Sequence, residues 1–405
     1  MKKTYITSAF IMTLVAASIT GCGNSSTVSE SSSSAAKEST SFAEAAETTE
    51  EAAETTEEAA ADTTAPENTD SDEVRQLSNT ADSDLFTKRD LEQTADTSEA
   101  KSITVADNKT IDISSEGVYT ISGSAENCTV RIDADETAKV QLVLDGVDIE
   151  NEDSPAIYVL SADKVFITTT DSENTLTVSG QFTSDGENNT DAVIYSKDDI
   201  VLNGTGTLSI TSNYGNGITC KDDMKITGGT YDVRSALDAF EANDTISGGT
   251  FTISGASDGI QACAVLQIDG GVFDITAAEG LEATYIVIND GDITISASDD
   301  GINASASSAA CETAVVFNGG NINVSVGQGD TDAVDSNGSV YVNGGTISIT
   351  AQMSSFDYDG TAEFNGGTII INGQEVSEIP QSMMGGGMRG GMRGGMDGGF
   401  GGRRF

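Results

Sequence analysis

Short runs of alternating apolar and polar residues recur along the chain from about residue 200, and a glycine pair or a variant of one marks each repeat. In Gly248-Gly249-Thr250-Phe251-Thr252-Ile253, two apolar residues follow the pair at alternate positions. The pairs are Gly228-Gly229, Gly248-Gly249, Gly270-Gly271, Asp290-Gly291, Gly319-Gly320, Gly344-Gly345 and Gly366-Gly367. Counted from Gly204, their first positions are 24, 20, 22, 20, 29, 25 and 22 residues apart. A recurring unit of this length indicates a repeat protein.

Each unit contains three short alternating stretches. One precedes the glycine pair, as at Ile286 and Ile288, one follows it, as at Ile293 and Ile295, and a third is the run Asp258-Gly259-Ile260-Gln261-Ala262. Such alternation predicts short strands with one buried face. Three strands in about 22 residues leave no room for a helix, but they can coil once around a triangular core and stack on the next coil about 4.8 Å away.

We therefore expect an all-β fold, a right-handed single-stranded parallel β-helix with about 20–25 residues and three short strands per coil. A seven- or eight-bladed propeller is the rival fold, but one blade needs four strands in roughly 40 residues. Equivalent positions of stacked coils form ladders, so Tyr231, Phe251 and Phe273 should lie above one another. We assign this aromatic column to filling the core, not to contact with a sugar.

The cysteines of the repeating region are expected to be mostly buried thiols. Cys220 and Cys263 lie two coils apart and at opposite parity in their strands, which separates them by about 9 Å or more. A disulfide needs Cα atoms within about 7 Å. Cys311 lies in the interval of 29 residues, where we expect an inserted lateral loop.

The first 22 residues resemble the export signal of a bacterial lipoprotein. Lys2 and Lys3 precede an apolar run, from Ala9 to Ile19, that is too short to span a membrane. The run ends in Ile19-Thr20-Gly21-Cys22, which resembles a lipobox, and by that resemblance Cys22 carries lipid. Ordinary signal cleavage with a free Cys22 is the alternative. We expect a lipid-anchored protein on the extracytoplasmic face of the cell membrane.

Two further segments lack the strand pattern. Residues 23–100 are rich in Ser, Thr, Ala and Glu and hold 20 acidic and four basic residues, which predicts a disordered acidic tether, with a helical stalk as the alternative. Residues 378–405 repeat Gly, Met and Arg and predict a flexible tail, or a cationic tail that contacts anionic wall polymer or folds back on the acidic body. The predicted order is therefore signal 1–22, tether 23–100, β-helix 101–377 and tail 378–405.

Composition excludes several classes of function. The 405 residues include 19 Lys and Arg, 65 Asp and Glu and no His, for a net charge of −46. Nucleic-acid binding needs clustered basic residues, and His-based zinc sites and Ser-His-Asp or Cys-His catalysis need an imidazole. Residues 101–377 alone hold 43 acidic and nine basic residues. The hard cation that such an excess of acidic oxygens suits is Ca²⁺.

Alignment of the third stretch of each unit places acidic or amide residues in two columns that flank an apolar residue. The first column contains Asp191, Asn216, Asp238, Asp258, Glu279, Asp300 and Asp332. The second contains Glu241, Gln261, Glu282, Asn303, Asp335 and Asp357. Carboxylates about 5 Å apart repel and raise each other's pKa, and nine basic residues cannot neutralise 43 acids. Ca²⁺ takes six to eight oxygen ligands, so we predict calcium sites along the columns.

The densest acidic cluster is Asp330-Thr331-Asp332-Ala333-Val334-Asp335-Ser336-Asn337-Gly338. The predicted metal ligands are Asp258, Glu279, Glu282, Asp299, Asp300, Asn303, Asp330, Asp332, Asp335, Asn337 and Asp357. The alternative is that Asp and Asn only shape tight turns by bonding local backbone. A turn role explains one acidic residue in each coil well and the second one poorly.

Several motifs in order resemble a known bacterial family over essentially all of residues 101–377. They are Gly117-Val118-Tyr119-Thr120-Ile121-Ser122-Gly123, Val143-Leu144-Asp145-Gly146-Val147-Asp148-Ile149, Pro155-Ala156-Ile157, Ser196-Lys197-Asp198-Asp199 and Cys220-Lys221-Asp222-Asp223. The chain resembles the carbohydrate-binding domain-containing proteins. That resemblance implies a β-helix similar to the pectate-lyase-type fold, bound calcium, and binding of cellulose and acidic plant sugars without an assigned catalytic activity. The lack of Trp, with aromatics at 5%, argues against the flat stacking strip of an ordinary cellulose module.

We expect non-catalytic, calcium-dependent polysaccharide binding at the bacterial cell surface, with cellulose or acidic pectin-type sugars as partners. A body this acidic repels uronic-acid polymers, and Ca²⁺ bridging between carboxylates reverses the repulsion. We expect a monomer that contacts the membrane only through its lipid and does not bind nucleic acid.

Two alternatives remain open. A polysaccharide lyase needs Ca²⁺ and a base that abstracts the C5 proton of the sugar, for which Lys197, Lys221, Lys225 and Arg234 are the candidates. Lys197 and Lys221 occupy equivalent turn positions in successive coils, which favours a structural role. The other alternative is a surface adhesin or structural spacer.

Overall fold

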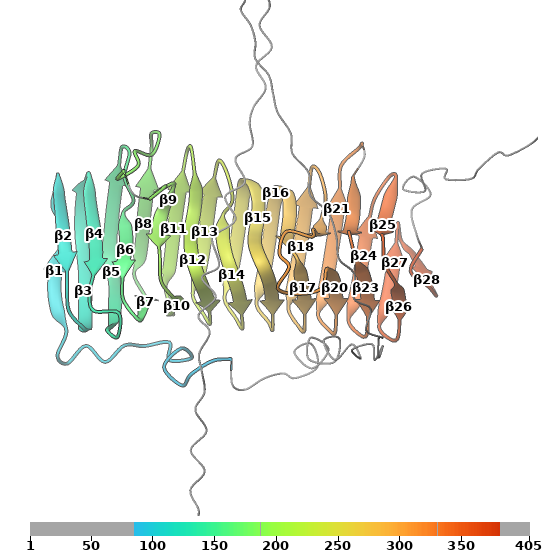
Figure 1. Ribbon diagram of the computed structural model, residues 1–405, viewed down its shortest axis with the longest axis horizontal. Coiled ribbons are helices and arrows are strands. Elements are labelled where there is room, and N and C mark those ends of the chain that lie inside the picture. Colours follow the sequence, from blue (N-terminus) through green and yellow to red (C-terminus); the bar gives the residue numbers. More distant parts are fainter. Residues whose placement is uncertain (1–84, 187, 330, 381–405) are drawn as a thin grey trace, which may run out of the picture. The chain divides into compact units, whose positions relative to one another are not determined.

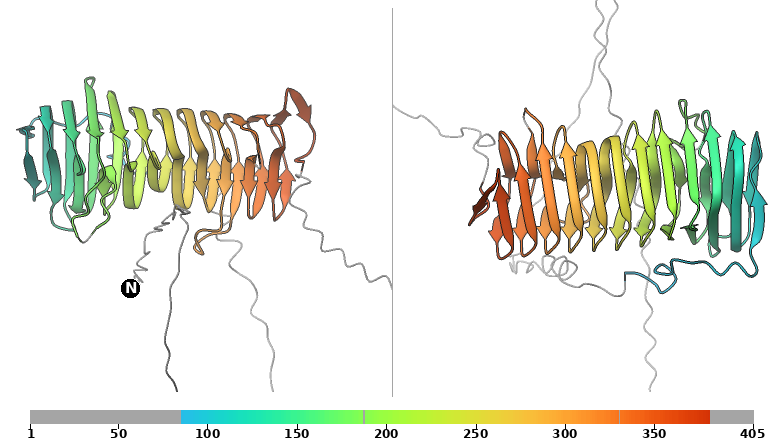
Figure 2. Two further views of the ribbon diagram at one scale, coloured as in Figure 1. Left: turned by 90° about the horizontal axis from the view of Figure 1, so that it is seen from above. Right: turned by 180° about the vertical axis from the view of Figure 1, so that it is seen from behind.

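A computed structural model describes residues 85–186, 188–329 and 331–380. In these ranges the chain forms 28 strands, β1 to β28, joined in one sheet that coils upon itself (Figure 1). Figure 2 shows the stacked coils from two further directions. No helix in the described ranges is long and apolar enough to cross a membrane.

The strands line three faces that run the length of the coil. Face 1 contains β1 (Lys101–Thr104), the first parts of β3 (Gly117–Glu126) and β5 (Lys139–Asn151), β7 (Lys164–Thr169), β10 (Ile200–Gly204), the last parts of β12 (Asn216–Ile226), β14 (Phe240–Ile246) and β15 (Thr250–Ile268), β17 (Tyr285–Ile288), β20 (Ala314–Phe317), β23 (Ser339–Val342) and β26 (Ala362–Phe364). Face 2 contains the later parts of β3 and β5, then β8 (Glu173–Val178), β11 (Thr207–Ser212), β13 (Thr230–Ser235), the first parts of β15 and β16 (Val272–Ala283), β18 (Asp292–Ala297), β21 (Asn321–Val326), β24 (Thr346–Thr350) and β27 (Thr368–Ile371). Face 3 contains β2 (Lys109–Ile113), β4 (Cys128–Asp133), β6 (Ile157–Ser161), β9 (Ala192–Ser196), the first parts of β12 and β14, the middle of β15, the end of β16, β19 (Ile302–Ala304), β22 (Asp332–Ser336) and β25 (Ser354–Tyr358).

The predicted parallel β-helix with three short strands per coil is confirmed. Strands pair with their equivalents one coil away in parallel register, as where Leu281 of β16 lies opposite Ile302 of β19. The last face-2 strand, β27, instead pairs in antiparallel fashion with β28 (Gln374–Val376) at the C-terminal end.

The aromatic column predicted for the core is present. Tyr231, Phe251 and Phe273 are buried and lie opposite one another in successive coils. The ring centroids of Tyr231 and Phe251 are 5.3 Å apart, and those of Phe251 and Phe273 are 4.5 Å apart with planes only 4° from parallel. Apolar residues of all three faces join this column in one continuous core.

The glycine pairs mark the corner between face 1 and face 2. The second glycine of a pair has a positive φ, +120° at Gly249 and +114° at Gly271. A Cβ on either would lie 3.0 Å from the ring of Phe251 or Phe273, respectively. Glycine therefore recurs there because the corner needs a left-handed backbone that also passes close to the core rings.

Amide side chains form a second ladder at the same corner. Each of Asn318, Asn343 and Asn365 donates from its Nδ2 to the Oδ1 of the asparagine one coil earlier, over 2.7 to 2.9 Å. Asn289 begins the ladder and donates to Asp269 over 2.6 Å. This ladder joins the later coils through side chains as well as backbone.

Residues 85–100, which composition assigns to the tether, lie against face 1 as a strap. Asp90 is fully buried and its Oδ1 lies 3.8 Å from Lys164 Nζ, and the Arg89 guanidinium lies 4.3 Å from the centre of the Phe166 ring. Lys225 Nζ donates to the carbonyl of Leu85 over 2.6 Å. The folded part of the chain therefore begins before residue 101, because a few well-placed side chains anchor a segment of otherwise polar composition.

The remaining sequence predictions concern the cysteines and the segments at the two ends of the chain. Cys128 and Cys220 are buried, whereas Cys263 and Cys311 are half-buried, and Cys311 lies in a loop between β19 and β20, as the 29-residue interval predicted. Cys22, the tether before residue 85, the tail from residue 381, and Asp330 lie outside the described residues.

Candidate functional site

The first acidic column lies where the chain enters face 3. Asp258 lies opposite Glu279 in the next coil. Asp238 Oδ1 accepts the backbone N–H of Asp258 over 3.3 Å, and Asp300 Oδ1 accepts that of Asp332 over 2.7 Å. One carboxylate oxygen of Asp238 and one of Asp300 therefore bond the backbone of the next coil, not the local backbone of their own turn, and each side chain has a second oxygen beyond that bond.

The second column lies on the outer side of face 3. Its register runs from Glu241 through Gln261, Glu282, Asn303 and Asp335 to Asp357, one residue in each coil. Two acidic or amide side chains per coil therefore line the same face over several coils.

The two columns meet most closely at Asp258, Glu279 and Glu282. One carboxylate oxygen from each lies within 4.8 Å of the others. Asp258 is 8% exposed, and the two glutamates are half-buried. Polar neighbours orient the glutamates: Asn303 Nδ2 donates to Glu279 Oε2 over 2.9 Å, and Gln261 Nε2 donates to Glu282 Oε2 over 3.0 Å. Three predicted ligands are thus brought together, and we call them the carboxylate cluster.

Electrostatics make the carboxylate cluster a costly place for negative charge. Burial, followed by the repulsion of Asp238 and Glu279, raises the pKa of Asp258 far above its usual range. Burial raises the pKa of Glu279 to about 7, and the charge on Glu282 adds to the effect despite the hydrogen bond from Asn303. At neutral pH the cluster therefore holds protons unless a cation replaces them.

A second acidic group lies in the following coils. Burial, then repulsion by Asp300, Asp332 and Asp357, raises the pKa of Asp335 to about 7. Asn303 Oδ1 is buried and has no hydrogen-bond partner in the described part of the chain.

The other predicted ligands lie toward the rim of these groups. Asp299 is exposed on the turn before Asp300, and its charge contributes to the raised pKa of Glu279. Asn337 is exposed on the turn after β22, and Asp330 lies outside the described residues.

The N-terminal end of the columns has its own cation. Lys221 Nζ lies 2.8 Å from Glu241 Oε1, while Glu241 Oε2 accepts from Asn216 over 2.7 Å and from Thr219 over 3.0 Å. Glu241 is therefore neutralised within the protein, in contrast to the carboxylate cluster.

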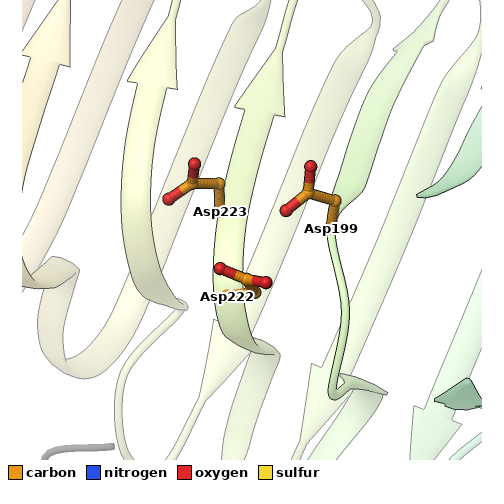
Figure 3. Close-up of side chains that lie close together, drawn as sticks. All are labelled: Asp199, Asp222 and Asp223. Carbon is orange, nitrogen blue, oxygen red and sulfur yellow. The ribbon is translucent and has the colours of Figure 1, made fainter. Parts of the chain in front are cut away.

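Sequence reasoning missed a further acidic group at the corner between face 3 and face 1. Asp199, Asp222 and Asp223 bring carboxylate oxygens within 4.8 Å of one another (Figure 3). Burial raises the pKa of Asp199 to about 6, although Lys164 Nζ lies 3.6 Å from its Oδ2. The signal was the repeated Lys-Asp-Asp at 197–199 and 221–223, whose spacing is one coil.

The bases considered for a lyase are either occupied or exposed. Lys221 pairs with Glu241, and Lys225 donates to the carbonyl of Leu85. Lys197 and Arg234 are exposed, Arg234 on face 2 and away from the acidic columns.

The architecture defines a parallel β-helix with a carboxylate-lined face, and comparison with known proteins gives its family. The chain belongs to the carbohydrate-binding domain-containing protein family, whose model matches residues 107–374. A carbohydrate-binding domain-containing protein of Acetivibrio thermocellus is 37% identical over 128 residues, which are 31% of this chain and 45% of that protein. The matched part therefore spans less than half the length of that relative. The polysaccharide lyase-like protein from C. thermocellum, solved as a gadolinium derivative, is similar over 67% of this chain and 94% of its own, at 25% identity and a TM-score of 0.37.

Proposed function

We propose that this protein binds polysaccharide at the bacterial cell surface without cleaving it, and that Ca²⁺ held by the carboxylate cluster takes part in binding. Family membership supports carbohydrate as the class of ligand. The observation that carries the calcium part is the convergence of Asp258, Glu279 and Glu282 within 4.8 Å.

The residues of the cluster fit a hard cation. Ca²⁺ prefers carboxylate and amide oxygens and takes six to eight of them. Three carboxylates converge here, and the buried Asn303 Oδ1 has no hydrogen-bond partner among the described residues. Asp258, Glu279 and Glu282 would hold the ion, and Asn303 is close enough to Glu279 to join them. A bound ion would supply positive charge to which sugar oxygens can bind.

The negative charge of the β-helix affects which polysaccharide can bind. Residues 101–377 hold 43 acidic and nine basic residues, so a uronic-acid polymer is repelled at low salt. Calcium shared between protein and sugar carboxylates offsets that repulsion. Acidic pectin-type polymers should therefore need Ca²⁺, whereas uncharged cellulose should depend on it less.

The acid–base chemistry of a lyase finds little support in the described residues. Such an enzyme needs a free base beside the bound ion. Lys221 contacts the second column, but it is already paired there with Glu241 at 2.8 Å. The location remains part of the proposal: a lipid on Cys22 would anchor the protein, as a monomer, on the outer side of the membrane.

Co-sedimentation of the protein with cellulose and with immobilised polygalacturonate, in Ca²⁺ and in excess chelator, tests this function. We expect binding to polygalacturonate that is lost in chelator. Equal capture in chelator contradicts the calcium part, and no capture by either polymer contradicts polysaccharide binding. Accumulation of unsaturated product, followed by its ultraviolet absorbance, would establish a lyase instead.

A further inference from the structure

The corner between face 2 and face 3 carries one large apolar side chain in each of three successive coils. Phe182 precedes β9, Tyr214 lies between β11 and β12, and Leu237 lies between β13 and β14. A Cβ on Gly215 would lie 2.7 Å from the Phe182 ring, so this ring packs beside the turn that holds Tyr214. The backbone N–H of Leu237 donates to the carbonyl of Gly215 over 3.2 Å, which places the next turn against it.

Tyr214 and Leu237 lie outside the apolar core. Tyr214 is 54% exposed and Leu237 is 41% exposed, whereas the half-buried Phe182 packs on the core. Other groups fix the turn: Asn213 Nδ2 donates to the carbonyl of Ser179 over 3.1 Å, and the N–H of Gly215 donates to Ser212 Oγ over 3.1 Å. Hydrogen bonds thus fix the turn that carries Tyr214, and more than half of the Tyr214 side chain is exposed to solvent.

This corner leads directly into the acidic columns. Asn216 follows Tyr214 by two residues, and Asp238 follows Leu237 directly. The negative charge is also weaker here, because Lys221 neutralises Glu241 and Asn216 replaces one acid of the first column. An exposed aromatic ring beside hydrogen-bonding side chains suits the mixed apolar and hydroxyl surface of a sugar ring.

We propose that Tyr214, flanked by Leu237, is a stacking platform for one uncharged pyranose ring of the bound polysaccharide. The proposal rests on polysaccharide binding and assigns one sugar position on this surface. The coil spacing of about 4.8 Å is close to the length of one pyranose unit, so a chain lying along the axis would extend from this ring over the acidic columns. The aromatic face meets the C–H groups of the sugar, and the neighbouring polar side chains meet its hydroxyls.

Titration calorimetry with cellohexaose in Ca²⁺-containing buffer tests the platform. We expect Tyr214→Ala to weaken binding about 3- to 10-fold, the range of an aromatic stacking contact, and Tyr214→Phe to bind within about twofold of the unchanged protein. Leu91→Ala is the matched control, because Leu91 is 50% exposed in the strap that lies against face 1, away from this corner. It should bind cellohexaose like the unchanged protein.

The outcomes separate this proposal from the proposed function. If the unchanged protein binds cellohexaose and Tyr214→Ala binds equally well, the platform is wrong while polysaccharide binding stands. If the unchanged protein binds polygalacturonate but not cellohexaose, the assignment to an uncharged ring is wrong. If it binds neither polymer, the proposed function fails as well. Equal weakening in Tyr214→Phe and Tyr214→Ala would also overturn stacking, because phenylalanine keeps the ring.

Discussion

Calcium should raise the melting temperature of this protein, and the rise should depend on the carboxylate cluster. Asp258, Glu279 and Glu282 converge within 4.8 Å in the folded chain, whereas an unfolded chain does not hold them together. An ion that binds only the folded state stabilises it by mass action. The perturbation is therefore the exchange of chelator for Ca²⁺ at fixed pH and ionic strength.

The size of the effect follows from the number of residues that unfold. At an ion concentration 100 times the dissociation constant, one site contributes about 2.7 kcal/mol. The described part contains about 300 residues, and unfolding entropy is about 2.1 cal/mol/K per residue, or roughly 0.6 kcal/mol/K in all. One occupied site should therefore raise the melting temperature by about 4 °C, and a second independent site should add a similar amount.

Differential scanning calorimetry of two double variants makes the test specific. Glu279→Gln with Glu282→Gln removes two carboxylates of the cluster and should abolish its share of the calcium shift. Glu363→Gln with Glu375→Gln changes the net charge equally at exposed sites near the C-terminal end and should retain the full shift. A wild-type shift near zero at millimolar Ca²⁺, or an equal shift in both double variants, would refute the reasoning.

Three other perturbations address the apo protein and the core. In chelator, stability to urea should fall as pH rises from 5 to 8, because the pKa values of Glu279 and Asp335 are raised to about 7 in the folded state. The stability that is present below the unfolded-state pKa values is lost as pH rises through the folded-state values. A stability that is constant or rises with pH contradicts this. Gly280→Ala should lower the free energy of unfolding by about 1–3 kcal/mol in urea melts, because the added Cβ would lie 2.4 Å from the Gly301 carbonyl oxygen. An unchanged urea midpoint would show that the two coils can move apart there. Phe251→Ala should cost about 3–5 kcal/mol in the same assay, since the ring stacks on two neighbours, and a cost below about 1 kcal/mol would mean that the column adds little.

The repeating pattern predicted the coil and the columns because parallel register turns a sequence period directly into a spatial ladder. Once Ile260 and Leu281 align in the core, Asp258 must lie opposite Glu279, regardless of the length of the loops between them. The hydrogen bonds within the columns were not predictable in the same way. Whether Asp238 bonds the backbone of Asp258 or faces solvent depends on a side-chain rotamer that periodicity does not determine.

The strap and the Asp199 group were missed for a different reason. Residues 85–100 have no strand period, and their attachment depends on single contacts such as Arg89 on Phe166 and Asp90 beside Lys164. Amino-acid composition does not reveal single contacts of this kind, so it assigned residues 85–100 to the tether. Asp199 and Asp223 belong to a repeated motif and lie one coil apart at the same corner, but whether their carboxylates converge with that of Asp222 depends on the turn geometry.

The strap also determines how the molecule bears tension. Figure 1 shows the described N-terminal segment running alongside the coils before it enters β1 at one end. Leu85 lies beside Lys225 of β12, several coils from that end. A pull from the N-terminal side therefore first loads the strap in shear, through Leu85, Asp90 and Gln93, each of which contacts β10, β12 or the turn that follows β12. The terminal strand β1, which would otherwise peel from β3 one hydrogen bond at a time, bears load only after those contacts have parted together.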